Sequence, residues 1–188
     1  MSYANGEIYI KNIRSAANTD TYTFSGDENG ETFVPSFTSH GFRYVEITGN
    51  GCELSDISFV TSLEGLVLCN TPDTTGSFEC SDPLVNQLQS NIQWGQRGNS
   101  LLVYTDCPQR NERMGWTGDA QVFAPTAAFN MDVQSFMNKW LLDVRDGQLM
   151  YNRQGAVPDT APLGGDNRPA GCAGWADASV IVPWEMYL

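Results

Sequence analysis

Hydrophobic residues in the first part of the chain occur in short runs that are rich in β-branched and aromatic side chains. Glycine, asparagine, aspartate and serine separate these runs, as at residues 25–27. Short runs bounded by turn residues are typical of an antiparallel sheet or sandwich. The runs that we predict to be strands are residues 7–11, 21–24, 42–47, 57–60 and 66–69.

The pattern changes to a helical period after residue 76. Leu84, Leu88 and Ile92 recur every four residues, which places them on one face of a helix. Ser81 is the expected N-cap of this helix, and Pro83 suits its first turn. The pattern therefore predicts an α+β chain, with an antiparallel β-sandwich portion over residues 1–76 and helices over residues 77–188.

Three further helical segments are expected. The second helix starts near residues 118–119, and the third has Asp132 as its N-cap and ends at Gly147. A loop rich in proline and glycine follows over residues 155–174, and the last helical segment begins near residues 175–177.

Charge and composition narrow the classes of function. The net charge of −12 disfavours nucleic acid and anionic membranes as partners, so a neutral ligand is the easiest fit. No apolar run is long enough to span a bilayer. No signal peptide is visible at the first residues, and the localisation of the protein stays open.

Cysteine and histidine usage argue against several kinds of site. The five cysteines form no C-x-x-C pair, which gives poor support for a disulfide framework, although a single bridge stays open. His40 is the single histidine, so a zinc site of usual composition or a histidine-dependent triad is not expected. Carboxylates are then the natural acid–base candidates.

Residues 104–119 hold the densest chemistry of the chain, with three carboxylates, two arginines and a tryptophan. Pro108, Gly115 and Gly118 indicate a loop between two helices, which is where sites often lie. The residues alone leave two interpretations open. The arginines pair with the carboxylates on a solvated surface, with Asp119 as a helix N-cap and Trp116 in the core, or the carboxylates form a site.

The run DCPQRNERMGWTGDA, from Asp106 to Ala120, resembles the signature of the bacterial-type α-L-rhamnosidases of glycoside hydrolase family 78. Residues 41–45, 81–86, 136–148 and 173–178 are similar to other parts of that family. The resemblance implies an (α/α)6-barrel catalytic domain preceded by β-sandwich domains. It also implies an inverting hydrolysis that uses no metal or organic cofactor. The chain would then span the end of a sandwich and the first helices of a truncated barrel.

The same resemblance assigns roles to individual residues. Glu112 matches the family's general acid, which burial near Trp116 and other carboxylates would keep protonated. Trp175 matches an aromatic wall of the rhamnose subsite. Asn111 stands where the family often has aspartate, so one charge fewer lies beside the acid. The other residues that match the substrate subsite are Asp106, Arg110, Trp116 and Asp119.

The resemblance also shows what is missing. The family's general base is a glutamate from a much later part of the barrel, and no segment here matches it. We therefore predict that the full-length protein removes terminal α-L-rhamnose from small or oligosaccharide rhamnosides, and that the isolated chain is inactive. Two alternatives stay open: an incompetent fragment that binds rhamnose weakly, and a hydrolase of another sugar on the same barrel. Oligomers could form through the exposed surface of the truncated barrel.

Overall fold

The computed structural model describes residues 6–49, 60–70, 73–150, 154–163 and 170–188. The chain divides into two compact units, which are described separately. Unit 1 comprises Met1–Leu66 and Gln109–Asn111, and unit 2 comprises Val67–Pro108 and Glu112–Leu188.

Extended backbone and turns make up the described part of unit 1. The 3-10 turn η1 (Lys11–Ile13) is closed by a bond from the Ile13 amide to the Ile10 carbonyl, 3.1 Å long. Around the turn at residues 25–27, the Glu31 carboxylate accepts three backbone amides, with distances of 2.8–3.0 Å, as well as the Tyr22 hydroxyl. These hydrogen bonds lower the pKa of Glu31 to about 2, and the bond from Tyr22 has the largest effect.

The sandwich that the sequence predicts is not confirmed by the described residues. No strand is assigned at residues 21–24, 42–47 or 66–69. Residues 7–11 contain one β-bridge, at Ile8, and the first residue of η1, and residues 57–59 lie outside the described ones. Phe24, Phe42 and Leu66 are 62–65% exposed. Alternation of apolar residues sets an extended backbone, but a strand also needs a partner for its backbone hydrogen bonds. The described residues of unit 1 do not supply that partner.

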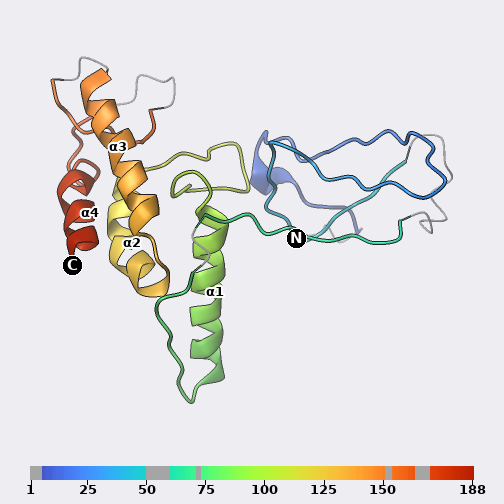
Figure 1. The fold of residues 1–188 in the computed structure, drawn as a ribbon, viewed down its shortest axis with the longest axis horizontal. Coiled ribbons are helices and arrows are strands. Elements are labelled where there is room, and N and C mark those ends of the chain that lie inside the picture. Colours follow the sequence, from blue (N-terminus) through green and yellow to red (C-terminus); the bar gives the residue numbers. More distant parts are fainter. Residues whose placement is uncertain (1–5, 50–59, 71–72, 151–153, 164–169) are drawn as a thin grey trace. The chain divides into compact units, whose positions relative to one another are not determined.

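Unit 2 holds four described helices: α1 (Pro83–Asn99), α2 (Thr117–Asn130), α3 (Gln134–Met150) and α4 (Ala178–Tyr187). Helix α4 packs against both α2 and α3 (Figure 1). Their core is centred on Met131, Met137, Trp140 and Val182, which are each at most 1% exposed. The Trp140 indole donates to the Ala161 carbonyl over 2.9 Å, so the buried ring leaves no unpaired N–H group. No described helix is both long and apolar enough to cross a membrane.

The helix ends follow the sequence signals with small corrections. Asp82, and not Ser81, is the N-cap of α1, because its carboxylate accepts the Leu84 amide over 2.9 Å and Pro83 is the first helical residue. Helix α2 begins at Thr117, one residue before the predicted start. The Asp132 carboxylate accepts the Gln134 amide over 3.3 Å, as predicted for the start of α3.

The predicted stop at Gly147 is wrong, because α3 continues to Met150. Gly147 is instead a point of close packing. A Cβ atom on it would lie 2.9 Å from Cγ of Pro158, so the glycine lets the loop after α3 approach the helix. The last helix begins at Ala178, shortly after the predicted position, since residues 173–177 form turns.

A chain of buried amides ties α1 to the end of α2. Gln96 is 2% exposed, and its side chain donates to the Ala127 carbonyl over 3.1 Å. Asn130 donates to Gln96 over 3.2 Å and accepts from Gln89 over 2.9 Å. Buried polar groups that are satisfied in this way fix one arrangement of the two helices. The loop that follows α1 therefore begins at a defined position relative to α2.

Candidate functional site

The candidate site lies on the loop between α1 and α2, where the sequence places it. Tyr104 anchors the start of this loop in the core. Its ring packs edge-on against Phe123 and Phe136, with centroids 5.9 and 4.8 Å away. Burial raises the pKa of Tyr104 to about 12, so the phenol stays neutral.

Two hydrogen bonds between Asp106 and Met114 close the loop into a compact turn. The Asp106 amide donates to the Met114 carbonyl over 3.1 Å, and the Met114 amide donates to the Asp106 carboxylate over 2.9 Å. Within the turn, Arg113 adopts a positive φ of 53°, and its side chain donates to the Pro108 carbonyl over 3.0 Å. A non-glycine residue in this conformation is uncommon and is held by its surroundings.

The closed turn brings the Asp106 and Glu112 carboxyl groups together. Burial raises the pKa of Asp106, and a hydrogen bond with Glu112 and its negative charge raise it further. The Trp116 indole donates to Glu112 Oε1 over 3.3 Å. Two interacting carboxyls beside an indole form a group that can hold one proton between them.

The Cys107 thiol lies near these carboxyls. One ligand atom from each of Asp106, Cys107 and Glu112 lies within 4.8 Å of the others, which is close enough for a metal ion. The carboxyl–carboxyl hydrogen bond accounts for the closeness of the two acids without an ion. The cluster therefore carries no metal assignment.

The second half of the motif is docked on a distant segment, residues 158–161. The Thr117 amide donates to the Asp159 carbonyl over 2.9 Å, and the Ala161 amide donates to the Gly115 carbonyl over 2.9 Å. A Cβ atom on Gly115 would lie 2.2 Å from the Ala161 carbonyl oxygen, so no larger residue fits there. Trp116, between these contacts, is half-buried and not a core residue. The sequence predicts a loop at these residues but gives no sign of their contact with the motif, because a loop has no periodicity.

Asp119 is the third residue of α2, and its side chain is exposed. Trp116 occupies the N-cap position, so the interpretation of Asp119 as an N-cap is wrong. An acid in the first turn is favoured by the positive end of the helix dipole. Its exposure leaves the carboxylate accessible to a ligand.

Trp175 lies against the same end of α2. A Cβ atom on Gly118 would be 3.0 Å from Cδ1 of the Trp175 ring, which shows how closely the indole approaches the helix. Trp175 as a whole residue is 38% exposed. Unit 2 thus brings Asp106, Glu112 and Trp116 together in one group. It also places Trp175 at the turn of α2 that carries Asp119.

Arg110, the remaining predicted site residue, belongs to unit 1 together with its neighbours Gln109 and Asn111. The Asn111 side chain donates to the Ser15 hydroxyl over 2.6 Å. Gly41 lies so close to Gln109 that a Cβ atom on the glycine would be 2.7 Å from Cβ of Gln109. Asn111 therefore donates a hydrogen bond within unit 1, whereas an ionised aspartate at this position would have no hydrogen to donate to Ser15.

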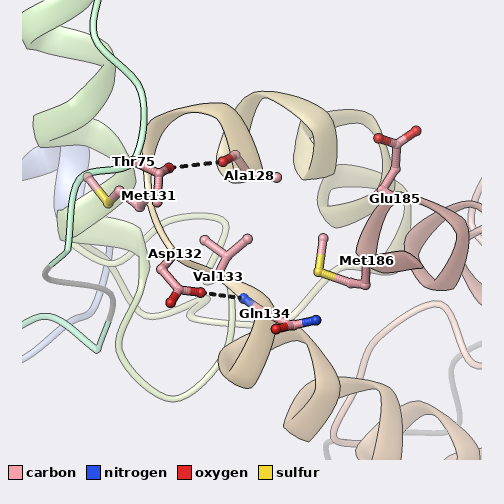
Figure 2. Close-up of a pocket in the computed structure, with 8 residues that line it drawn as sticks. All are labelled: Thr75, Ala128, Met131, Asp132, Val133, Gln134, Glu185 and Met186. Atoms are coloured by element: carbon pink, nitrogen blue, oxygen red, sulfur yellow. Dashed lines mark hydrogen bonds between the residues drawn. The ribbon is translucent and has the colours of Figure 1, made fainter. Parts of the chain in front are cut away.

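A separate cavity of about 200 Å³ in unit 2 contains none of the predicted site residues (Figure 2). It lies where the end of α2, the start of α3 and the end of α4 meet. Two of its polar groups are engaged in local structure: the Thr75 hydroxyl donates to the Ala128 carbonyl over 3.1 Å, and the Asp132 carboxylate caps α3. The cavity is best explained as the junction of these helix ends.

Comparisons with known proteins agree on one family. The sequence model of the bacterial alpha-L-rhamnosidase 6 hairpin glycosidase domain matches residues 73–188, and that of the bacterial alpha-L-rhamnosidase concanavalin-like domain matches residues 2–68. These two domain types fit a sheet-forming part followed by a helical part.

Individual relatives carry the same description. An alpha-L-rhamnosidase of Streptomyces avermitilis is 52% identical over 97% of this chain, and one of Formosa agariphila is 44% identical over 97% of it. The crystal structure of the Streptomyces avermitilis enzyme, solved in complex with L-rhamnose, covers 98% of this chain with a TM-score of 0.85 and 51% identity. The native enzyme of Aspergillus terreus covers 61% of the chain with a TM-score of 0.57 and 44% identity. The chain spans 17% and 19% of the lengths of the two sequence relatives, and 17% and 13% of the two solved chains.

Proposed function

Because the chain belongs to the family of bacterial alpha-L-rhamnosidases, we propose that it carries the acid half of an active site that removes terminal α-L-rhamnose from glycosides. Glu112 is the proton donor. The observation that carries this proposal is the group formed by Glu112, the Trp116 indole and the Asp106 carboxyl. A proton donor must keep its proton near neutral pH, and a second carboxyl group beside it favours the protonated state of the pair.

The other residues of the subsite bind and orient the sugar. Asp106 and Asp119 each accept sugar hydroxyls, and Arg110 donates to a hydroxyl or orients a carboxylate. Trp116 and Trp175 offer apolar faces to the ring and its methyl group. The substrates are rhamnosides, either small molecules or oligosaccharides, and the chemistry uses no metal or organic cofactor.

The general base comes from outside this set. An inverting glycosidase keeps its two carboxyl groups about 6.5–9.5 Å apart so that a sugar and a water molecule fit between them. Asp106 and Glu112 contact each other on one loop, which leaves no such space. Asp106 therefore binds substrate and does not serve as the base, which is contributed by a later part of a longer protein.

The proposed architecture follows the same family. Residues 1–76 form part of a β-sandwich, and residues 77–188 form the first helices of an (α/α)6 barrel. In the structure, residues 67–70 and 73–76 belong to unit 2 with the helices, as the bond from the Thr75 amide to the Asn130 carbonyl (3.1 Å) illustrates. Strands contributed by other parts of the longer protein would pair with the extended segments of unit 1.

The test is a change of Glu112 to Gln in the complete enzyme. This is the full-length protein that contains the chain or, where only the segment is at hand, a hybrid in which the chain replaces the matching segment of the Streptomyces avermitilis enzyme. Glutamine keeps the shape but cannot donate the proton, so turnover of a rhamnoside with a poor leaving group should fall by about 10²–10⁴-fold. Turnover of an aryl rhamnoside with a good leaving group should fall much less, because that group departs without protonation.

A matched control is Glu185→Gln, which removes a half-buried glutamate of α4 at the separate cavity shown in Figure 2. Its turnover should equal that of the unmodified enzyme on both substrates. Equal losses on the two substrates for Glu112→Gln would contradict the role of Glu112 as the acid.

A further inference from the structure

Trp175 lies at the end of a short turn whose backbone is tightly specified. Gly171 and Gly174 have φ angles of 78° and 83°, a conformation that residues with side chains rarely adopt. The amides of Trp175 and Ala176 both donate to the Cys172 carbonyl, over 3.1 and 2.9 Å. The turn therefore presents the indole at one defined place on unit 2.

Helix α2 holds this turn from one side. Gln121 is 8% exposed, and its side-chain amide donates to the Gly174 carbonyl. One turn earlier, Gly118 lies directly under the indole: an added Cβ atom would be 3.0 Å from Cδ1 and 3.1 Å from Nε1 of Trp175. Because that spacing is tighter than ordinary van der Waals contact, a side chain at position 118 would have to displace the ring.

Asp159 holds the turn from the other side. Its carboxylate, on a residue that is 7% exposed, accepts a hydrogen bond from the Cys172 thiol, which raises the pKa of Cys172. The Asp159 carbonyl accepts the Thr117 amide and hydroxyl, over 2.9 and 3.0 Å. The Trp175 turn is thus bound to the beginning of α2 both directly and through Asp159.

We propose that Gly118 and Gln121 are positioning residues that hold the Trp175 indole in place as a wall of the rhamnose subsite. The inference rests on the proposed function, in which Trp175 contacts the sugar. Gly118 permits the close approach of the ring, and Gln121 fixes the backbone that carries it. Asp119 follows Gly118 in the same turn of α2. This one helical turn therefore determines the position of the aromatic wall and of a carboxylate that binds sugar hydroxyls.

The binding of a sugar on an aromatic face depends on the position of the ring, so displacement of the indole should weaken substrate binding more than the chemical step. In the complete enzyme, Gly118→Ala and Gln121→Met should each raise KM for an aryl α-L-rhamnoside roughly threefold to tenfold, with a smaller change in kcat. Alanine is a better helix former than glycine, so Gly118→Ala should not lower the melting temperature through helix propensity. The rise in KM with a smaller change in kcat, and not the melting temperature, separates positioning from a general loss of structure, because displacement of the ring also costs packing energy.

Gln148→Met is the matched control. Gln148 also donates its side-chain amide to a glycine carbonyl, that of Gly155, over 3.0 Å, but it does so from α3 and to a residue outside the Trp175 turn. It should leave KM unchanged. A second check is the change Gln121→Met in a Trp175→Ala background, where its effect on KM should disappear because the ring that it positions is gone.

These outcomes separate the inference from the proposed function. If turnover still depends on Glu112 but Gly118→Ala and Gln121→Met have the same KM as Gln148→Met, the positioning role is overturned and the acid role stands. An effect of Gln121→Met that persists in the Trp175→Ala background would also overturn it. Loss of the dependence on Glu112 would overturn the proposed function instead.

Discussion

Asp106 and Met114 are joined by two hydrogen bonds, one from each backbone amide, so the Asp106 carboxylate serves both as a structural acceptor and as a member of the candidate site. The bond from the Met114 amide needs only an oxygen at this position, which an asparagine can also supply. The charge of Asp106 is therefore not required to close the loop. Structure and function can be separated by a single substitution.

We predict that Asp106→Asn stabilises the protein at neutral pH. The pKa of Asp106 is raised in the fold by burial and by Glu112, so ionising it costs more free energy in the folded state than in the unfolded state. This cost is absent below the ordinary pKa of aspartate and develops as the pH rises through the folded value. Asparagine does not ionise, so the variant avoids this cost. Its gain in the free energy of unfolding should be present at neutral pH and vanish below about pH 4.

Urea unfolding at several pH values measures this difference. Asp146→Asn, which removes a charge from the exposed surface of α3, controls for the loss of one negative charge from an acidic chain. In the complete enzyme the same Asp106→Asn change should lower kcat/KM for every rhamnoside, because hydrogen bonds to the sugar are weakened. A stabilisation that is equally large at pH 3 and pH 7 would contradict the proposed cause.

Gly115 makes a second testable contact. A Cβ atom there would meet the Ala161 carbonyl oxygen at 2.2 Å and the Val103 side chain at 3.1 Å, so Gly115→Ala must push residues 158–161 away from the motif. Overpacking of this kind should lower the free energy of unfolding by about 1–3 kcal/mol. Gly95→Ala is the control, because a Cβ atom at this position of α1 meets nothing within 4 Å.

The two alanine variants should have opposite signs. Gly95→Ala should raise the free energy of unfolding by up to about 1 kcal/mol through helix propensity. Thermal or urea unfolding of both variants beside the unmodified protein gives the comparison. A stability of Gly115→Ala equal to that of the unmodified protein would mean that residues 158–161 do not fix the motif.

Asp119→Asn tests whether the exposed carboxylate binds sugar. The side chain lies in the first turn of α2, so its loss should change the free energy of unfolding by no more than about 1 kcal/mol, the usual size of a helix-dipole effect. In the complete enzyme, kcat/KM should fall for good and poor leaving groups alike, since the carboxylate binds the rhamnose ring and not the leaving group. An unchanged kcat/KM would reduce Asp119 to a residue that stabilises the helix end.

The sequence predicts the local features of this site well and the contacts between distant segments poorly. Capping chemistry gives the start of α1 to within one residue, and Pro108 and Gly115 place the first part of the motif on a loop, whereas Gly118 is the second residue of α2. These signals are local, because a cap or a turn is decided within a few residues. The prediction at Gly147 is wrong because a sequence does not distinguish a glycine that ends a helix from one that allows a neighbouring segment to pack closely.

Contacts across long sequence separations carry no comparable signal. The docking of Thr117 on Asp159 and of Gly118 under Trp175 joins segments that are separated by loops without periodicity. The strands of the predicted sandwich are unconfirmed in the described residues for a related reason. A run such as residues 42–47 favours an extended backbone, but its pairing depends on another segment that local reasoning cannot identify.

The last prediction concerns the 188-residue chain by itself: it should show no measurable rhamnosidase activity. Inversion needs a base on the face of the sugar opposite Glu112, and Asp106 lies on the loop of the acid itself, in contact with it. The helices of unit 2 also expose large apolar side chains, among them Leu84 at 78%, Val122 at 77% and Val180 at 71%. Such surface favours association, so the purified chain should form oligomers or aggregates.

The assay measures chromophore release from an aryl α-L-rhamnoside at high protein concentration, beside a Glu112→Gln variant of the same chain. Light scattering after size exclusion reports the state of association in the same preparation. Release should equal that of the variant, because both lack the base and differ only in the acid. Release well above the variant from a monodisperse monomer would require a base within these residues. Asp159, a nearly buried carboxylate outside the motif loop, would then be the first residue to substitute.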